Sequence, residues 1–179
     1  MRHFIEACDK ALKSQNWHAA LAIALTMPDI CASLSSPSGK TNGKKYASWW
    51  DKYVGPGYRR LMGRPAKEHV FMSGNDCYAL RCAFLHQGLD DVSTQRVEKA
   101  LSAFVFSVPP DNGMVHRNQF NDVLQLQVDE FCRELSQGVV RWLEDVATDD
   151  RIQAALARLM TIKPAGDAFS ASGFPIMIN

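Results

Sequence analysis

The spacing of apolar residues at the start of the chain predicts two helices that pack on each other. In residues 3–14, apolar side chains recur at three- and four-residue intervals with polar residues opposite, which is typical of an amphipathic helix. Residues 17–34 repeat this spacing, Asn16 is a suitable N-cap, and Pro28 predicts a kink beyond the middle. Because each apolar stripe needs a neighbour, we expect an antiparallel helical pair.

Turn residues divide the next part of the chain. Residues 35–43 have loop composition, and residues 44–54 form a predicted short helix that Gly55-Pro-Gly57 ends. Residues 58–73 show no clear period, although residues 58–62 have room for one or two helical turns. This region is therefore left largely unassigned.

A strongly apolar segment follows. It is predicted to begin near Ser73, Asn75 or Asp76 and to end at Gly88, because short polar residues cap helix N-termini and glycine caps C-termini. Its side chains are apolar on nearly every face. Such a helix belongs at the centre of a bundle.

The second half of the chain has features of both strands and helices. Residues 102–108 are rich in aromatic and β-branched side chains, and residues 123–128 alternate apolar with polar positions. With a Pro- and Gly-containing turn signal between them, these runs predict a small antiparallel β-hairpin inserted at about residues 102–128. Residues 129–147 carry a helical apolar stripe, and a further helix is predicted over residues 150–160.

These elements predict a mainly α-helical fold in a single domain, residues 1–163, followed by a C-terminal tail, residues 164–179. A chain of 179 residues is long enough to bury roughly 70% of the surface that its unfolded form exposes. Its 46% hydrophobic and 22% charged residues are ordinary for a soluble globular protein. Disorder of the whole chain is therefore not expected.

Charge and cysteine usage narrow the class of protein. The formal net charge of +1 predicts neither nucleic acid nor membrane as a partner of the molecule as a whole. The five cysteines are scattered without paired spacing, which favours reduced thiols and a cytoplasmic location. Acids interrupt what would have to be the apolar core of a signal peptide in residues 1–10, and no run approaches the roughly 20 apolar residues of a spanning helix. Secretion and membrane insertion are therefore disfavoured. The five histidines show no ligand spacing, and neither a metal nor a cofactor is expected.

One segment departs from this neutral balance. Residues 40–67 hold eight basic residues and one acid, Asp51, a net charge of +7 that leaves −6 for the rest of the chain. Aromatic side chains interleave with the bases, as suits phosphate contacts combined with base stacking. The predicted nucleic-acid contacts are Lys40, Lys44, Lys45, Trp49, Trp50, Arg59, Arg60 and Arg64. The alternative is that the aromatics belong to the core and the bases to a solvated face.

The run Ser38-Gly-Lys-Thr41 invites comparison with a phosphate-binding loop. The leading glycine that such a loop requires is here Leu34, and the preceding segment is predicted as helix rather than strand. We therefore reject a nucleotide triphosphatase.

Arg81 and His86 are the residues best suited to catalysis. An arginine keeps its charge when it is buried and must find a partner, whereas a histidine exchanges a proton near neutral pH. Together they have the chemistry for phosphodiester cleavage without a metal.

The motif Arg81-x-x-x-x-His86 resembles the signature of the HEPN superfamily, in which an arginine and a histidine are separated by four to six residues. The resemblance implies a helical bundle, a homodimer with a shared cleft, and metal-independent endoribonuclease activity in defence or toxin–antitoxin systems, with an antitoxin or defence-system partner. It implies that His86 is the acid or base at the 2′-hydroxyl and leaving oxygen, and that Arg81 holds the negative phosphorane.

One departure from the usual pattern and one constraint of helix geometry bear on this motif. Cys82 stands where Asn, Asp or His commonly follows the arginine. Residues five apart also lie about 140° apart around a helix and roughly 7.5 Å along it. We therefore expect Arg81 and His86 to converge only through a frayed last turn or a second subunit.

A non-catalytic alternative remains open. Arg81 would then form an interior salt bridge to an acid such as Glu6, Asp29 or Asp76, and His86 would be a helix-end residue favoured by the helix dipole. The chain would in that case be a HEPN-like binding or interaction module of a defence system.

Overall fold

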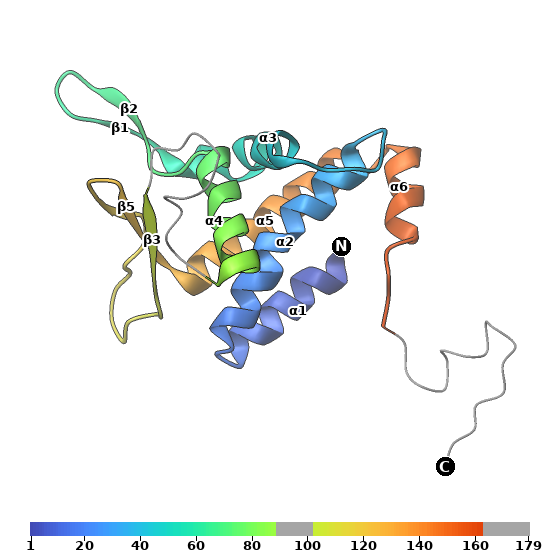
Figure 1. Cartoon of the computed structure of the whole chain (residues 1–179), viewed down its shortest axis with the longest axis horizontal. Coiled ribbons are helices and arrows are strands. Elements are labelled where there is room, and N and C mark those ends of the chain that lie inside the picture. Colours follow the sequence, from blue (N-terminus) through green and yellow to red (C-terminus); the bar gives the residue numbers. More distant parts are fainter. Residues whose placement is uncertain (89–101, 163–179) are drawn as a thin grey trace, which may run out of the picture.

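The computed structural model describes residues 1–88 and 102–162, which form six α-helices, a short 3₁₀ helix and two small sheets (Figure 1). A mainly α-helical fold is thereby confirmed. The helices are α1 (Arg2–Lys13), α2 (Trp17–Ser35), α3 (Gly43–Tyr53), η1 (Gly55–Tyr58), α4 (Gly74–Gln87), α5 (Val128–Asp145) and α6 (Asp150–Ala157). The predicted tail, residues 164–179, lies outside the described residues.

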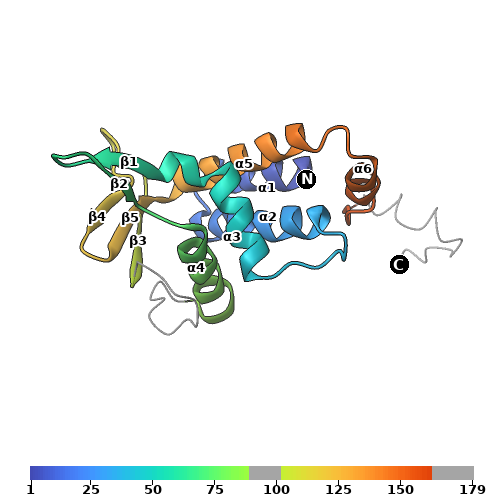
Figure 2. The ribbon, with the colours of Figure 1, turned by 90° about the horizontal axis from the view of Figure 1, so that it is seen from above.

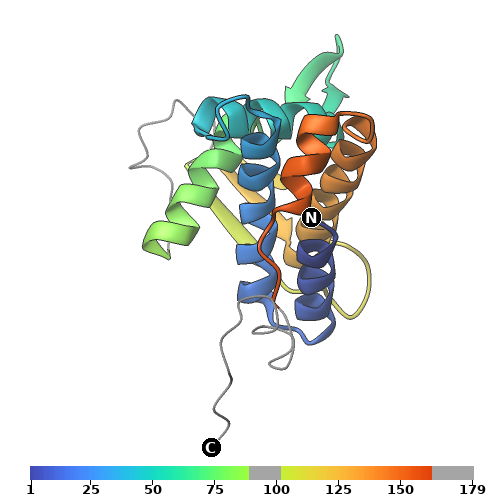
Figure 3. The same cartoon turned by 90° about the vertical axis from the view of Figure 1, so that its right-hand side faces the viewer.

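Helix α2 is the central element of the fold, and it contacts each of the other five α-helices. Figure 3 shows it standing between α4 on one side and α1 and α5 on the other. The predicted antiparallel pairing of α1 with α2 is confirmed, and the Asn16 side chain caps α2 by accepting from the Ala19 N–H at 3.3 Å. The helix continues past Pro28 without a break and ends at Ser35.

The composition of α2 follows from this position. At 19 residues, α2 is long and apolar enough to cross a membrane by those two criteria alone. Its fully buried residues, among them Ala24, Leu25 and Cys31, instead face the other helices of the core. The same length and composition are found in the core helices of soluble proteins.

Helices α3 and α4 pack closely because a glycine lies between their backbones. A Cβ atom at Gly74 would lie 2.2 Å from the carbonyl oxygen of Ala47. The Gly74 N–H also donates to the carboxylate of Asp51 at 2.9 Å, so this acid from α3 binds the first turn of α4. The other face of α3 buries Trp50, whose ring lies 5.1 Å from that of Tyr58 and 6.0 Å from that of Phe131.

An antiparallel hairpin forms where no strand was predicted. Strands β1 (Arg59–Met62) and β2 (Lys67–Val70) pair with Arg59 opposite Val70, so the suggestion of helical turns at residues 58–62 is wrong. The hairpin projects from the body (Figure 1), and residues 59–68 are all exposed. Strands this exposed lack the alternation by which a half-buried strand is recognised in a sequence.

The predicted β insertion is present, with a different topology. Strands β3 (Ala103–Ser107), β4 (Asn118–Phe120) and β5 (Val123–Gln127) form a sheet in the order β3-β5-β4. Strand β4 pairs antiparallel with β5 in a tight hairpin, whereas β3 pairs parallel to β5. The expected antiparallel pairing of residues 102–108 with 123–128 is therefore wrong. The hairpin occupies one edge of β5, and the long connection after β3 lets the chain return to the same end of the sheet.

The sheet is attached to the helices through one apolar face. Phe104, Leu124 and Leu126 are fully buried in the common core, and β5 continues directly into α5. The His69 side chain of β2 lies 2.8 Å from the Gln119 side chain of β4, which links the two sheets. Figure 2 shows both sheets at one end of the molecule and α6 at the other.

We expect Gly74→Ala to lower the free energy of unfolding by about 1–3 kcal/mol, because α3 and α4 must separate to admit the new methyl group. Alanine is a better helix former than glycine by about 1 kcal/mol, so helix propensity alone would make the variant more stable. A loss of stability would therefore come from the contact between α3 and α4. Urea unfolding measures the change. Asn75→Ala, at the next and exposed position of α4, is the matched control, and equal stability of the two variants would contradict the close packing.

Candidate functional site

The ends of α4 determine where Arg81 and His86 lie. At the start, the Ser73 hydroxyl accepts from the Asp76 N–H at 3.2 Å, and the Asp76 carboxylate accepts from the Ser73 N–H at 2.9 Å. At the end, Gly88 has a φ of 69° and its N–H reaches the carbonyls of the last turn. The predicted caps are therefore confirmed, and His86 belongs to the last turn of a regular helix.

Arg81 joins α4 to α2 through an ion pair. Its Nε atom donates to Oδ2 of Asp29 at 2.7 Å, so Asp29 is its partner among the acids considered from the sequence. The two side chains are only 21% and 14% exposed. Burial raises the pKa of Asp29, and the neighbouring guanidinium opposes that effect. Burial also disfavours the charge of Arg81, but its interactions with the Asp29 carboxylate and with the Cys82 side chain outweigh burial, and the pKa of Arg81 is raised.

The same guanidinium contacts His86. Nη1 of Arg81 lies 2.8 Å from Nε2 of His86, and the imidazole is exposed to solvent. Because a guanidinium has donors only, Nε2 accepts this hydrogen bond and carries no proton in this arrangement. The expectation that convergence needs a frayed turn or a second subunit is wrong, since the long arginine side chain spans the distance within one chain.

The basic segment is divided between two places. Lys40, Lys44 and Lys45 lie at the N-terminal end of α3, whereas Arg59, Arg60 and Arg64 lie on the hairpin beyond its other end (Figure 1). Helix α3 is 11 residues or about 16 Å long, and the two groups lie toward its opposite ends. Within the hairpin, Arg59 pairs with Glu68 at 3.2 Å. The bases therefore form two separate clusters rather than one stripe.

The tryptophans of that segment belong to the core. Trp50 is 0% exposed and Trp49 is 5% exposed, so the expectation that they stack on bases is corrected by their burial. Helix α3 turns its aromatic side toward α5 and η1 to cover apolar surface there. The sequence also allowed the alternative that the aromatic side chains belong to the core. That alternative holds for Trp49 and Trp50.

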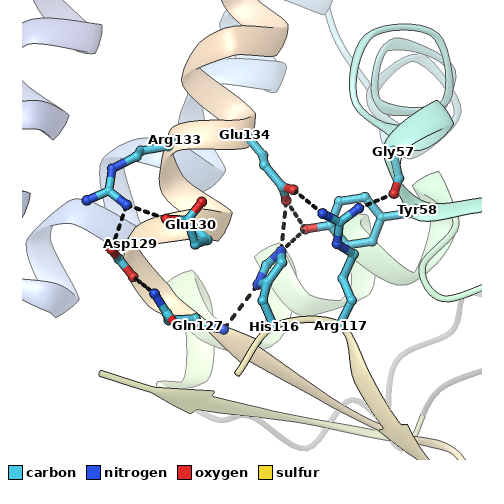
Figure 4. A network of polar contacts seen from close by, with 9 residues as sticks. All are labelled: Gly57, Tyr58, His116, Arg117, Gln127, Asp129, Glu130, Arg133 and Glu134. Carbon is cyan, nitrogen blue, oxygen red and sulfur yellow. Dashed lines mark hydrogen bonds and ion pairs between the residues drawn. The ribbon is translucent and has the colours of Figure 1, made fainter. Parts of the chain in front are cut away.

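A second polar cluster, which we call the Glu134 network, was not predicted from the sequence (Figure 4). The Glu134 carboxylate accepts from the Tyr58 hydroxyl at 2.5 Å and from Nε2 of His116 at 3.1 Å. Arg117 pairs with the same carboxylate at 3.1 Å and donates to the carbonyl of Gly57. These residues come from η1, the segment before β4, and α5, and no sequence spacing connects them.

The hydrogen bonds of His116 assign its tautomer. The backbone N–H of Gln127 donates to Nδ1 at 3.2 Å, so the ring proton lies on Nε2 and is donated to Glu134. The side chain of His116 is 1% exposed. Both nitrogens are thus occupied by contacts within the fold, and the ring ties the segment before β4 to α5.

The electrostatics of the network follow from burial and pairing. Burial alone would raise the pKa of Glu134, but the hydrogen bonds from His116 and Tyr58 and the charge of Arg117 outweigh it and lower the pKa. Burial and the adjacent Glu134 charge raise the pKa of Tyr58 well above its ordinary value. Next to this network, Asp129 accepts from Gln127 at 2.8 Å and from Arg133 at 2.6 Å (Figure 4).

Comparison of the chain with models of known protein families, with curated proteins and with solved structures gives no match. Within residues 1–88 and 102–162, no three His, Cys, Asp or Glu side chains are grouped so that they could hold a metal ion. The five cysteines carry free thiols, four of them buried. The chemistry of Arg81 and His86 must therefore be judged from their own geometry.

We expect Glu134→Gln to lower the free energy of unfolding by about 1–3 kcal/mol at pH 7, because the amide keeps the shape but loses the charge beside Arg117. A carboxyl with a lowered pKa in the folded state stabilises the fold above its ordinary value of 4.5, and this contribution is lost as the pH falls through the folded pKa. The difference between variant and wild type should therefore shrink below pH 4.5.

Urea unfolding at pH 7 and at successively lower pH measures this difference. Glu144→Gln, an exposed position on the same helix, is the matched control. A difference that stays constant across the acid range would show that the charge of Glu134 does not stabilise the fold.

Proposed function

We propose that the chain is a metal-independent endoribonuclease whose reacting groups are Arg81 and His86. The observation that carries this proposal is the 2.8 Å contact between the Arg81 guanidinium and an exposed imidazole whose Nε2 carries no proton. An unprotonated, accessible Nε2 is suited to act as a general base, and an adjacent fixed cation is suited to hold the negative charge that develops on a phosphate. The resemblance of the motif to the HEPN signature supports the same assignment.

The proposed reaction is an internal transesterification of RNA. The 2′-hydroxyl of the substrate displaces Arg81 as the donor to Nε2 of His86 and transfers its proton there. The 2′-oxygen then bonds to phosphorus, the bond from phosphorus to the 5′-oxygen breaks, and His86 returns the proton to that leaving oxygen. The products are a 2′,3′-cyclic phosphate end and a 5′-hydroxyl end.

The supporting residues have distinct proposed roles. Asp29 is a positioning residue, because its 2.7 Å bond to Nε fixes the plane of the Arg81 guanidinium while leaving the two terminal nitrogens to other partners. The exposed hairpin bases Arg60 and Arg64 are the proposed contacts to RNA further along the backbone. By the HEPN resemblance we further propose a cytoplasmic homodimer acting in defence or stress response with an antitoxin or similar partner.

We expect purified wild type to cleave mixed cellular RNA in EDTA, and His86→Ala to be slower by about 10²–10⁴-fold, because a general base contributes about that much. His86→Gln is the sharper variant, since its amide still accepts a hydrogen bond from Arg81 but cannot take up the proton. Gel analysis and end-group mapping for 2′,3′-cyclic phosphate measure the result. Cleavage that persists in His86→Gln would remove the assignment.

A second candidate function, a non-catalytic binding or interaction module, is favoured by the ion pair of Arg81 with Asp29. Two largely buried partners from α4 and α2 have the features of a contact that holds helices in register. In this alternative the guanidinium is structural, and His86 is an exposed residue at a helix end.

We expect Arg81→Ala to lower the free energy of unfolding by about 1–3 kcal/mol. The Asp29 carboxylate is only 14% exposed, and the substitution would leave it without its cationic partner. Thermal and urea unfolding measure this loss. Arg60→Ala, at an exposed position of the hairpin, removes the same charge and is the control. An unchanged melting temperature would exclude a structural role for the ion pair. Intact cleavage by a folded Arg81→Ala variant would count against Arg81 as a catalytic residue.

A further inference from the structure

A cavity lies away from Arg81 and away from the Glu134 network. It has a volume of about 610 Å³, within the range of small-molecule sites. It is bounded by the C-terminal end of α2, the loop that follows and one face of α3. Figure 2 shows these elements together on the side of the molecule nearer α6.

One face of α3 supplies most of the cavity wall. Lys44, Ser48 and Lys52 are spaced four residues apart, and Lys45, Trp49 and Tyr53 form the neighbouring row. Residues four apart lie on the same side of a helix, so the cationic and aromatic rows run side by side along the cavity. The opposite wall includes Ala32 and the serines at positions 35, 36 and 38.

The charge of this wall is one-sided. Three lysines line the cavity and no carboxylate does. Lys52 pairs with Asp145 at 2.7 Å, whereas in residues 1–88 and 102–162 neither Lys44 nor Lys45 has a carboxylate partner. Two uncompensated ammonium groups match the charge of about −2 that a phosphate monoester carries at neutral pH.

Lys45 is held in place by neutral groups. Its Nζ atom donates to the Ser36 hydroxyl at 2.6 Å and to the carbonyl of Lys40 at 2.8 Å. An ammonium group has three N–H donors, so one remains for a ligand. Ser36 is itself buried and its hydroxyl lies 3.0 Å from that of Ser38, so the lysine is part of a rigid polar wall.

The negative end of α2 would oppose an anion here if its carbonyls were free. Arg151 of α6 covers them, donating to the carbonyl oxygens of Leu34 at 3.0 Å, Ser35 at 3.1 Å and Ser36 at 3.4 Å. A helix C-terminus carries a partial negative charge that a cation neutralises. The C-terminal end of α2 therefore does not oppose an anion in the cavity.

We propose that this cavity binds a mononucleotide, with its phosphate at Lys44 and Lys45 and its base against the ring of Tyr53. The aromatic and alanine side chains provide an apolar surface for a ring, and the lysines and serine hydroxyls provide donors for a phosphate. The run Ser38-Gly-Lys-Thr41, which lacks the glycine geometry of a phosphate loop, lies in the loop beside this wall. The site is independent of RNA cleavage at Arg81.

Isothermal titration of the full chain with AMP, GMP, CMP and UMP tests the proposal, with adenosine and inorganic phosphate as partial ligands. We expect at least one mononucleotide to bind with a Kd of about 1 mM or tighter. We also expect its nucleoside and inorganic phosphate to bind at least tenfold more weakly, because each offers only half of the contacts. Quenching of tryptophan fluorescence through Trp49 gives a second readout.

Two variants locate the binding. Lys44→Gln removes a lining charge at an exposed position, and Ser48→Trp fills the cavity without changing charge, also from an exposed position. Both should weaken mononucleotide binding at least fivefold with an unchanged melting temperature. Lys67→Gln on the hairpin, with the same loss of charge, should bind as wild type does.

Absence of binding by all four mononucleotides would overturn the proposal. So would binding that Ser48→Trp and Lys44→Gln leave unchanged, or that Lys67→Gln weakens equally, since the ligand would then lie elsewhere or respond only to overall charge.

Discussion

The packing of α2 against all five other α-helices is the constraint on which the rest of this structure depends. Five helices pack around it, so nearly all of its length must be apolar, and any polar group on it must be satisfied by a neighbour. Asp29 is the one acidic residue of α2, and Arg81 of α4 is the group that satisfies it. The position and orientation of the candidate catalytic arginine therefore follow from the need to accommodate a carboxylate in the central helix.

The same helix connects the two candidate sites. Its middle holds Asp29, and hence the contact of Arg81 with His86, whereas its C-terminal end forms a wall of the cavity beside α3. Arg151 secures that end by binding the last carbonyls, and the indole of Trp142 donates to the Ser35 hydroxyl at 2.9 Å. Both sites are thus built on a rigid element rather than on loops alone, which favours fixed geometry in each.

The sheet end of the molecule depends on a different interaction. The segment before β4 crosses between η1 and α5, and the Glu134 network fixes it to both through His116 and Arg117. Because Glu134 is stabilised as a carboxylate by three partners, the network acts as a single, partly buried ionic contact between distant parts of the chain. It holds the inserted sheet while leaving α4, with Arg81 and His86, to be positioned by α2.

Features that arise from neighbouring residues could be predicted from the amino-acid sequence. The helical periods of α1, α2 and α5, the Asn16 cap of α2, and the Ser73 and Gly88 ends of α4 could all be predicted, because caps and amphipathic stripes depend on residues within a few positions. The identity of Arg81 and His86 as the chemically notable pair also came from the sequence. Only the tertiary structure decided that Asp29 pairs with Arg81, that β3 runs parallel to β5, that Trp50 is buried, and that the basic segment is split between two clusters. Each of these depends on residues that lie far apart in the chain, and their pairing is selected by the packing of the whole fold rather than by any local preference.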